Sequence, residues 1–262
     1  MSQRPHQVIG PNRAELYADG EVVRFPDKPW TPAIHAFLRH LEDAGFAGAP
    51  RVVEHGSGGR GSQALSYPEG ELQYTRAWTD KRITALGALL REFHEVAQRF
   101  TPPEQAVWKP WFIRHVRPAT GFGQGEVAPW NILARDGEPV AFVDWQYAGP
   151  MDPFVDLAQA AWLNAHLHDV VVVDLHDRPS IELRANQLRL FVDAYGLETE
   201  RRDDLVELMI EFVVNSCANE ANEVHGTSRS ATDGSAALGM AWRARSAAWI
   251  LRNRDLLKRA LS

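Results

Sequence analysis

The sequence predicts an α+β protein with two lobes, a small antiparallel β-rich lobe over residues 1–68 and a larger, mainly helical lobe over residues 69–262. The prediction rests on a change of hydrophobic pattern. Before residue 68 the apolar residues form short runs bounded by turn residues, and after it they recur at helical spacing over long stretches. Pro68, Glu69 and Gly70 separate the two patterns, because proline and glycine this close together interrupt regular structure. We place the hinge between the lobes there.

The small lobe carries clear turn and helix-start signals. Asp19 and Gly20 form a dipeptide that favours a tight β-hairpin turn. Thr31 precedes Pro32, and proline is favoured at the first position of a helix, so we expect Thr31 to be the N-cap residue. The expected elements are strands at residues 15–18, 21–25, 51–53 and 63–67, and one helix that begins at Thr31 and ends at Gly45.

Hydrophobic residues at intervals of three and four mark the helices of the large lobe. Leu86, Leu89, Leu90 and Phe93 share one face of the first of these helices. The expected helices cover residues 83–100, 154–167, 181–195, 203–224 and 238–261.

The composition is that of an ordinary globular protein and excludes several classes of function. Hydrophobic residues make up 45% of the chain and charged residues 24%. The formal net charge is −6, so we expect no nucleic-acid partner. No window is long and apolar enough to span a membrane, and the N-terminus lacks the apolar core of a signal peptide. We therefore expect no membrane association and a cytoplasmic location.

One short segment in the middle of the chain carries the candidate chemistry. Asp136 and Gly137 lie between two apolar runs and predict a β-hairpin. This hairpin would place Asn131 near the start of its first strand and Asp144 at the end of its second, so their side chains come close together. Glu126 lies in the loop just before the hairpin. Two carboxylates and an amide oxygen that converge on one spot suit a hard cation with phosphate attached.

This segment resembles the aminoglycoside phosphotransferases, a branch of the protein-kinase-like fold. Kinases place an asparagine five residues after the catalytic base, and Glu126 and Asn131 keep this spacing. The continuation from Asp152-Pro153 to Asp156-Leu157-Ala158 is similar to a stretch of the same family. The resemblance implies the following roles: Glu126 as the base, Asn131 and Asp144 as metal ligands, and Gln124 and Asp156 as residues that support the loop.

The resemblance also implies Mg²⁺ and either ATP or GTP as cofactors, with a small hydroxylated molecule as the substrate. Family members hold the α- and β-phosphates with a lysine on a strand of the small lobe, paired with an acidic residue on the helix. Arg24 is the candidate for that cation, although it fits a solvated strand residue equally well, and His35 lies roughly where the acidic partner is expected. Ser66 and Tyr67, at the end of the last strand of the small lobe, are assigned to the nucleotide side.

The catalytic loop departs from the family at two positions. Gln124 stands where the family has histidine, and Glu126 stands where it has aspartate. Glutamate keeps the charge but is longer by one methylene group, which displaces the carboxylate by roughly 1 Å unless the loop compensates. Three readings stay open: a working small-molecule kinase, a pseudokinase that binds without transferring phosphate, and a kinase fold that performs other acid–base chemistry.

Three glutamates in one predicted helix allow two interpretations. Glu211, Glu220 and Glu223 either face a cationic substrate or form a solvated helix face.

Overall fold

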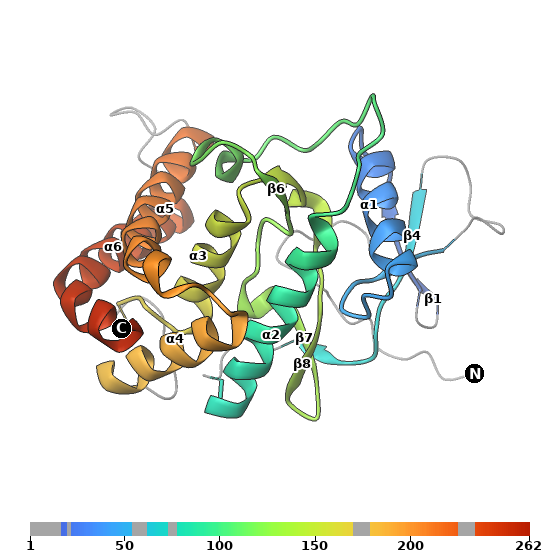
Figure 1. Ribbon diagram of the computed structural model, residues 1–262. Helices are drawn as coiled ribbons and strands as arrows, with labels where there is room; N and C mark the ends of the chain where they lie inside the picture. The colour runs from blue at the N-terminus through green and yellow to red at the C-terminus, as the bar shows by residue number, and fades with distance from the viewer. Residues whose placement is uncertain (1–16, 20–21, 54–61, 73–77, 170–178, 225–233) are drawn as a thin grey trace.

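The computed structural model describes residues 17–19, 22–53, 62–72, 78–169, 179–224 and 234–262, and it has a small sheet with one helix beside a larger body of helices (Figure 1). The strands are β1 (Tyr17–Asp19), β2 (Val22–Pro26), β3 (Arg51–Val52), β4 (Ser62–Ser66), β5 (Glu71–Leu72), β6 (Gly121–Gly123), β7 (Ile132–Arg135), β8 (Glu138–Phe142) and β9 (Gly149–Met151). The α-helices are α1 (Thr31–Asp43), α2 (Asp80–Ala97), α3 (Pro153–Asn164), α4 (Ile181–Tyr195), α5 (Arg202–Glu223) and α6 (Gly234–Leu261). Short 3-10 helices are η1 (Phe112–His115), η2 (Pro129–Asn131), η3 (Trp145–Tyr147) and η4 (Thr199–Arg201).

The N-terminal sheet is antiparallel, with the strand order β1-β2-β4-β3. Helix α1 buries Phe37, Leu38 and Leu41 completely in the core, and its His35 side chain is hydrogen-bonded to Gln63 of β4 at 2.9 Å. The helix therefore packs on one face of the sheet. This part of the structure confirms the predicted α+β fold class with a small antiparallel sheet and a mainly helical remainder.

Helix α1 begins and ends close to the predicted positions, but its N-cap differs. The N-cap residue is Trp30, which makes no side-chain capping bond. Thr31 lies one residue inside the helix, and its hydroxyl accepts a hydrogen bond from the backbone N–H of Lys28 at 2.9 Å. Gly45 follows the helix with φ +82°, a left-handed conformation that glycine adopts without strain.

The predicted hairpin after the catalytic loop is confirmed as β7 and β8. Asp136 and Gly137 form its two-residue turn with φ values of +53° and +78°, as a type I′ turn requires. Strand β5 pairs with β7 on the other side, so the sheet order is β5-β7-β8. The lobe boundary at residue 68 stays a prediction, and β5 directly after it already belongs to the second sheet.

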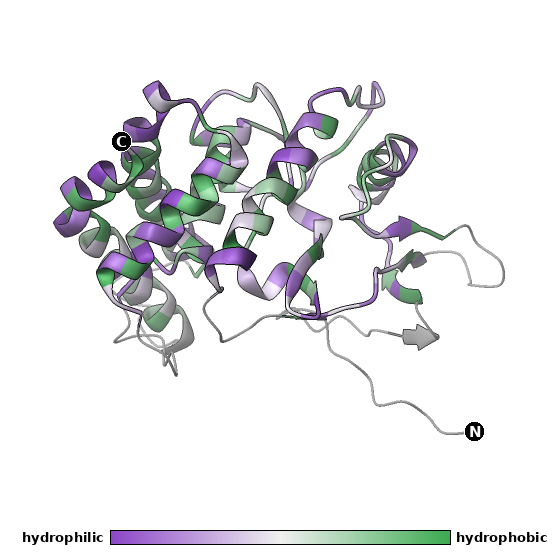
Figure 2. Ribbon diagram, turned by 60° about the horizontal axis from the view of Figure 1, so that its bottom comes forward, coloured by the Kyte–Doolittle hydropathy of each residue, from purple (hydrophilic) through white to green (hydrophobic). Residues whose placement is uncertain are grey.

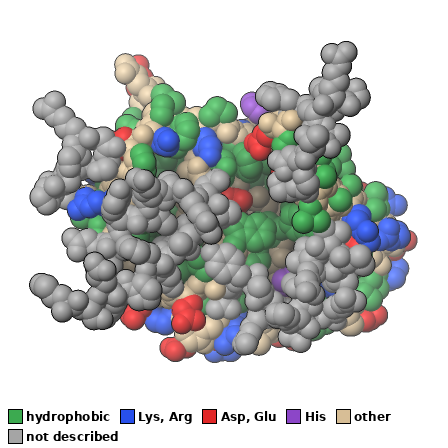
Figure 3. All heavy atoms as spheres, turned by 180° about the vertical axis from the view of Figure 1, so that it is seen from behind, with side chains coloured by type: hydrophobic (Ala, Val, Ile, Leu, Met, Phe, Trp, Pro, Cys, Tyr) green, Lys and Arg blue, Asp and Glu red, His purple; other side chains and the backbone are tan. Residues whose placement is uncertain are grey.

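The helices of the C-terminal part confirm the five predicted segments, with ends that differ by a few residues. The most extensive contacts join α5 to α6 and α2 to α4. Figure 2 shows helices with one hydrophobic and one hydrophilic side, and the hydrophobic sides meet in the interior. Trp162, Phe191 and Phe212 are among the largest buried side chains there. From behind, Figure 3 shows hydrophobic side chains in the middle of the surface with acidic groups among them.

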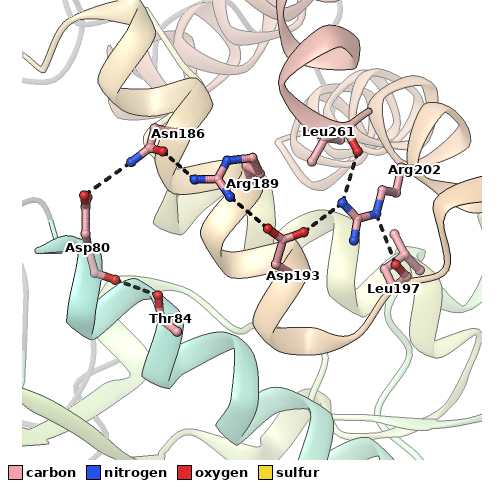
Figure 4. Close-up of polar contacts among 8 residues, drawn as sticks. All are labelled: Asp80, Thr84, Asn186, Arg189, Asp193, Leu197, Arg202 and Leu261. Atoms are coloured by element: carbon pink, nitrogen blue, oxygen red, sulfur yellow. Dashed lines mark hydrogen bonds and ion pairs between the residues drawn. The ribbon is translucent and has the colours of Figure 1, made fainter.

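A chain of polar contacts along the surface ties these helices together (Figure 4). Asn186 of α4 donates to the Asp80 carboxylate of α2 and accepts from Arg189. Asp193, near the end of α4, forms ion pairs with Arg189 at 3.0 Å and with Arg202 of α5 at 2.8 Å. Such exposed pairs each contribute at most about 1 kcal/mol, so the buried apolar faces hold the helices together. Among the described helices, none is long and apolar enough to cross a membrane.

A glycine at the α2–α4 contact gives the first testable prediction. A Cβ atom at Gly87 would overlap the backbone carbonyl of Phe191, which cannot rotate away. We expect Gly87→Ala to lower the free energy of unfolding by about 2–3 kcal/mol, although alanine gains about 1 kcal/mol of helix propensity. Chemical denaturation measures the change.

Gly239 of α6 is the matched control, because it is also helical. A Cβ there meets only the flexible ends of Arg243 and Glu220, at 3.1 and 3.2 Å. Gly239→Ala should be neutral or stabilising by up to about 1 kcal/mol. Equal stability of the two alanine variants would contradict the assigned α2–α4 packing.

Candidate active site

The catalytic loop, residues 124–131, is held from behind by one buried carboxylate. Asp156 lies in the first turn of α3 and is completely buried. Its two oxygens accept the backbone N–H groups of Gln124 and Gly125, both at 2.9 Å. Gly125 has φ +86°, and a Cβ there would lie 2.6 Å from the carbonyl oxygen of Tyr147. The loop therefore needs glycine at this position and the carboxylate behind it, which is the placement expected for Asp156.

A histidine connects the same carboxylate to the helices behind the site. His94 of α2 is buried, and its Nε2 lies 3.2 Å from Asp156 Oδ2. Its Nδ1 is hydrogen-bonded to the Tyr195 hydroxyl of α4 at 2.8 Å. Asp156 thus has three hydrogen-bond partners from two parts of the fold.

Gln124, which replaces the family's histidine, is fully buried and uses all of its side-chain polar atoms. Its Nε2 donates to the carbonyls of Val143 at 2.8 Å and Asp144 at 3.1 Å. Its Oε1 accepts the backbone N–H of Glu126 at 2.7 Å. Gln124 therefore joins the catalytic loop to the end of the β7–β8 hairpin and fixes the backbone at Glu126.

Glu126, Asn131 and Asp144 come together on the open side of the loop, as their spacing predicts. Burial and, second, the charge of Asp144 raise the pKa of Glu126 to about 7. Hydrogen bonds from Asn131 and Trp130 and the charge of Lys109 oppose this rise. A carboxylate whose pKa lies near neutrality has the protonation behaviour of a general base.

Asn131 presents an unpaired oxygen to this cluster. Its Nδ2 donates to the carbonyl of Glu126 at 3.0 Å, which fixes the orientation of the amide. Its Oδ1 is buried and has no hydrogen-bond partner. A buried acceptor without a partner costs about 1–3 kcal/mol, and a bound cation would satisfy it. The residue thus fits the role of a metal ligand.

Asp144 is the second candidate ligand and lies at the start of η3 in a strained conformation. Its backbone has φ +55°, which is uncommon for residues other than glycine and concentrates at functional sites. Burial raises the pKa of its carboxyl group, and a hydrogen bond from Gln146 at 3.3 Å opposes this. One carboxylate and one amide oxygen suit Mg²⁺, which keeps several waters and takes other ligands from phosphates. Within the described ranges, no group of three His, Cys, Asp or Glu side chains could hold a metal.

A largely apolar pocket lies between the N-terminal sheet, α1 and the residues that follow β8. Its lining residues are Phe25, Pro26, Lys28, Trp30, Thr31, Ile34, Gln63, Leu65, Tyr67, Asp144, Trp145 and Gln146. Asp144 is common to the pocket and to the carboxylate cluster. A flat aromatic group with an attached phosphate chain fits such a pocket, because the apolar walls lead to the candidate metal ligands.

The structure separates the three residues assigned to the nucleotide side. Tyr67 lines the pocket. Arg24 and Ser66 do not, since neighbouring residues of a strand point to opposite faces of the sheet. Phe25 and its cross-strand partner Gln63 face the pocket, whereas Arg24 and Ser66 share the other face. The assignment of Arg24 as phosphate clamp therefore lacks support from its placement.

A segment between α2 and β6, which sequence reasoning did not assign to the site, contributes to it. Trp111 donates to the carbonyl of Gly125 at 2.9 Å and stacks on Tyr147 with ring centroids 4.1 Å apart. Arg114 donates to the backbone carbonyls of Lys109, Tyr147, Ala148 and Pro150. These contacts connect residues distant in sequence, and only the density of cationic and aromatic residues around Trp111 hinted at them.

Of the three glutamates on α5, the structure brings only one toward the site. Glu220 forms an ion pair with Arg243 at 3.3 Å, and Glu211 is exposed. Burial lowers the pKa of Lys109, and the charge of Glu223 is one of those that oppose this fall. Burial raises the pKa of Tyr147, and the charge of Glu223 adds to this rise. Glu223 therefore adds negative charge at the outer side of the cluster.

The chain has the fold of the protein-kinase-like phosphotransferases. A sequence model of the phosphotransferase enzyme family matches residues 104–205, which include the catalytic loop and the hairpin. This match covers the central part of the chain. The whole chain is 38% identical over 256 residues to the trifolitoxin immunity protein of Rhizobium leguminosarum bv. trifolii, covering 97% of this chain and 98% of that protein, so it belongs to the family of that protein.

Solved structures support the same fold at low sequence identity. An amicoumacin kinase is 12% identical with a TM-score of 0.62, covering 92% of this chain and 89% of that one. An aminoglycoside phosphotransferase from Alicyclobacillus acidocaldarius is 14% identical with a TM-score of 0.56, covering 99% and 98%. A microcompartment-associated aminopropanol kinase is 14% identical with a TM-score of 0.57, covering 96% and 93%.

The buried bonds of Gln124 give the second testable prediction. Gln124→Ala leaves two carbonyls and one N–H group without their partner, so we expect the free energy of unfolding to fall by about 2–3 kcal/mol. Urea denaturation measures it. The exposed Gln98 is the matched control, and Gln98→Ala should change stability by less than about 0.5 kcal/mol. A Gln124→Ala protein as stable as the Gln98→Ala protein would show that the side chain is dispensable.

Proposed function

We propose that the protein is an enzyme that transfers the terminal phosphoryl group of a magnesium-bound ATP or GTP to a hydroxyl group of a small molecule. The observation that carries this proposal is the cluster of Glu126, Asn131 and Asp144, in which a base with a pKa near 7 faces two candidate metal ligands. The fold shared with small-molecule kinases supports it.

Each residue would have a separate role in the reaction. Glu126 accepts the proton of the acceptor hydroxyl while the hydroxyl oxygen forms a bond to phosphorus, and the bond to the nucleoside diphosphate breaks. Asn131 and Asp144 would hold the magnesium ion, which would supply positive charge to the phosphate oxygens. The apolar pocket beside Asp144 takes the nucleoside.

The structure offers a reason why glutamate can serve in place of aspartate. Gln124 fixes the backbone of Glu126 through a 2.7 Å hydrogen bond to its N–H group, and Asp156 holds the two preceding residues. The side chain of Gln124 is therefore bonded to the backbone of Glu126, so one substituted residue fixes the backbone position of the other.

A second proposal concerns the acceptor and rests on the relationship to the trifolitoxin immunity protein. Because the identity extends over nearly the whole of both chains, we propose that this protein also confers immunity to a toxin. If the protein is a kinase, the toxin carries the hydroxyl group that becomes phosphorylated. If it is a pseudokinase, it binds the toxin without phosphorylating it.

The third testable prediction separates these two readings. Glu126→Gln removes the base but keeps the shape of the side chain, so we expect phosphoryl transfer to fall by roughly 10²–10⁴-fold while binding of the magnesium nucleotide persists. Asp144→Asn should instead weaken nucleotide binding, because it removes a metal ligand. Nucleotide consumption over a panel of hydroxylated toxins and amino sugars measures the first, and thermal shift with and without magnesium measures the second.

Two further variants control for the length of the acid. Glu126→Asp should lower turnover or leave it unchanged if the loop is fitted to glutamate. A rise in activity on combining Glu126→Asp with Gln124→His would indicate a decayed kinase. No consumption with any acceptor, together with no magnesium-dependent stabilisation by ATP or GTP, would rule out the kinase and leave the binding protein.

A further inference from the structure

We propose that Lys109, from the segment between α2 and β6, binds the terminal phosphate of the nucleotide and replaces the lysine that kinases carry on a strand of the small lobe. The inference rests on the proposed phosphotransferase function. It assigns a cation to a site whose predicted cation, Arg24, faces the other side of the sheet.

The strand position that faces the pocket carries no cation. Kinases hold the phosphates with a lysine on the strand before the helix of the small lobe. On the corresponding strand β2, the residues that line the pocket are Phe25 and Pro26, and neither carries a charge. Opposite it on β4 lies Gln63, which is hydrogen-bonded to His35 of α1 at 2.9 Å. An aromatic ring and a His–Gln pair therefore occupy the place of the usual lysine–glutamate ion pair.

The other described cations of the N-terminal part bind elsewhere or are exposed. Arg51 donates to the carbonyl of Phe46 at 2.9 Å and lies 3.7 Å from Glu42. Lys28 lines the pocket and is an exposed residue, and its charge acts on Lys109. Among the described residues of this part, none projects a partly buried cation toward Asp144.

Lys109 has the placement that these residues lack. Its Nζ donates to Gln146 Oε1 at 2.5 Å and lies 3.8 Å from the centre of the Tyr147 ring. Gln146 in turn donates to Asp144. Burial lowers the pKa of Lys109, and the charges of Asp144 and Glu126 oppose this fall, so the ammonium group lies within electrostatic range of both carboxylates. A phosphoryl group transferred between Asp144 and a hydroxyl at Glu126 would be exposed to the charge of this ammonium group.

The backbone around Lys109 is fixed to the site, which distinguishes it from a solvated surface lysine. Arg114 donates two hydrogen bonds to the carbonyl of Lys109, at 3.1 and 3.3 Å, and others to the carbonyls of Tyr147, at the end of η3, and Ala148. Trp111, two residues further on, donates to the carbonyl of Gly125 in the catalytic loop. A lysine anchored in this way keeps its ammonium group beside the carboxylates at low entropic cost.

A merely structural lysine would neutralise the two carboxylates without touching the nucleotide, so the test must compare ligands. We expect full-length Lys109→Met to raise the Kd of the magnesium nucleoside triphosphate about 10–100-fold, with a smaller rise for the diphosphate and a change within about 2-fold for the nucleoside. Lys109→Arg should restore part of the triphosphate affinity because it keeps the charge. Isothermal titration calorimetry with the adenine and guanine series measures each Kd.

Two variants serve as comparisons. Lys81 forms an exposed ion pair with Glu138 at 2.7 Å, so Lys81→Met controls for the loss of one surface charge and should leave all three affinities unchanged. Arg24→Met tests the competing assignment and should also leave them unchanged. Selective loss of triphosphate affinity in Arg24→Met, or equal losses for nucleoside and triphosphate in Lys109→Met, would overturn the proposal.

The wild-type protein separates failure of this inference from failure of the proposed function. If wild-type binds no nucleotide in the presence of magnesium, the phosphotransferase function fails and the inference falls with it. If wild-type prefers the triphosphate and Lys109→Met keeps that preference, only the assignment of Lys109 is wrong.

Discussion

The buried carboxylate of Asp156 is the interaction on which the rest of the site depends. It accepts the N–H groups of Gln124 and Gly125 and contacts His94, so one side chain joins α3, α2 and the catalytic loop. Burying a carboxylate without hydrogen-bond partners costs free energy. That cost is lowest in the one loop conformation that supplies both N–H groups. That conformation requires a left-handed glycine at position 125, and it sends Glu126 to the open side of the loop.

On the open side of the loop, the protonation of the carboxylates depends on their burial and on the charged groups close to them. Burial and the negative charge of Asp144 raise the pKa of Glu126, whereas the positive charge of Lys109 lowers it. The unpaired Oδ1 of Asn131 adds a further negative dipole to the cluster. An arrangement with two partly buried carboxylates and one cation is short of positive charge. A divalent cation would correct this deficit and would also pair the one buried, unpaired side-chain acceptor of the loop, Asn131 Oδ1.

Much of this could be predicted from sequence, because it depends on local rules. The Asp136-Gly137 turn, the helices and the spacing from Glu126 to Asp144 follow from dipeptide preference and periodicity. The face of Arg24 could not be predicted, since shifting a strand by one residue exchanges its faces. Lys109 could not be predicted either, because its position depends on hydrogen bonds to residues more than 30 positions away.

The positions of Phe25 and Lys109 have a consequence for how the two parts of the protein cooperate. In a kinase with a strand lysine, the phosphates are held from both lobes, and movement of the small lobe controls the reaction. With Lys109 as the clamp, the base, the metal ligands and the phosphate cation would all belong to the segment from 109 to 144, joined by Arg114, Trp111 and Gln124. The small sheet would then supply only apolar walls for the nucleoside. Phe25 suits that task, and the strand needs no lysine because Lys109 would bind the phosphate.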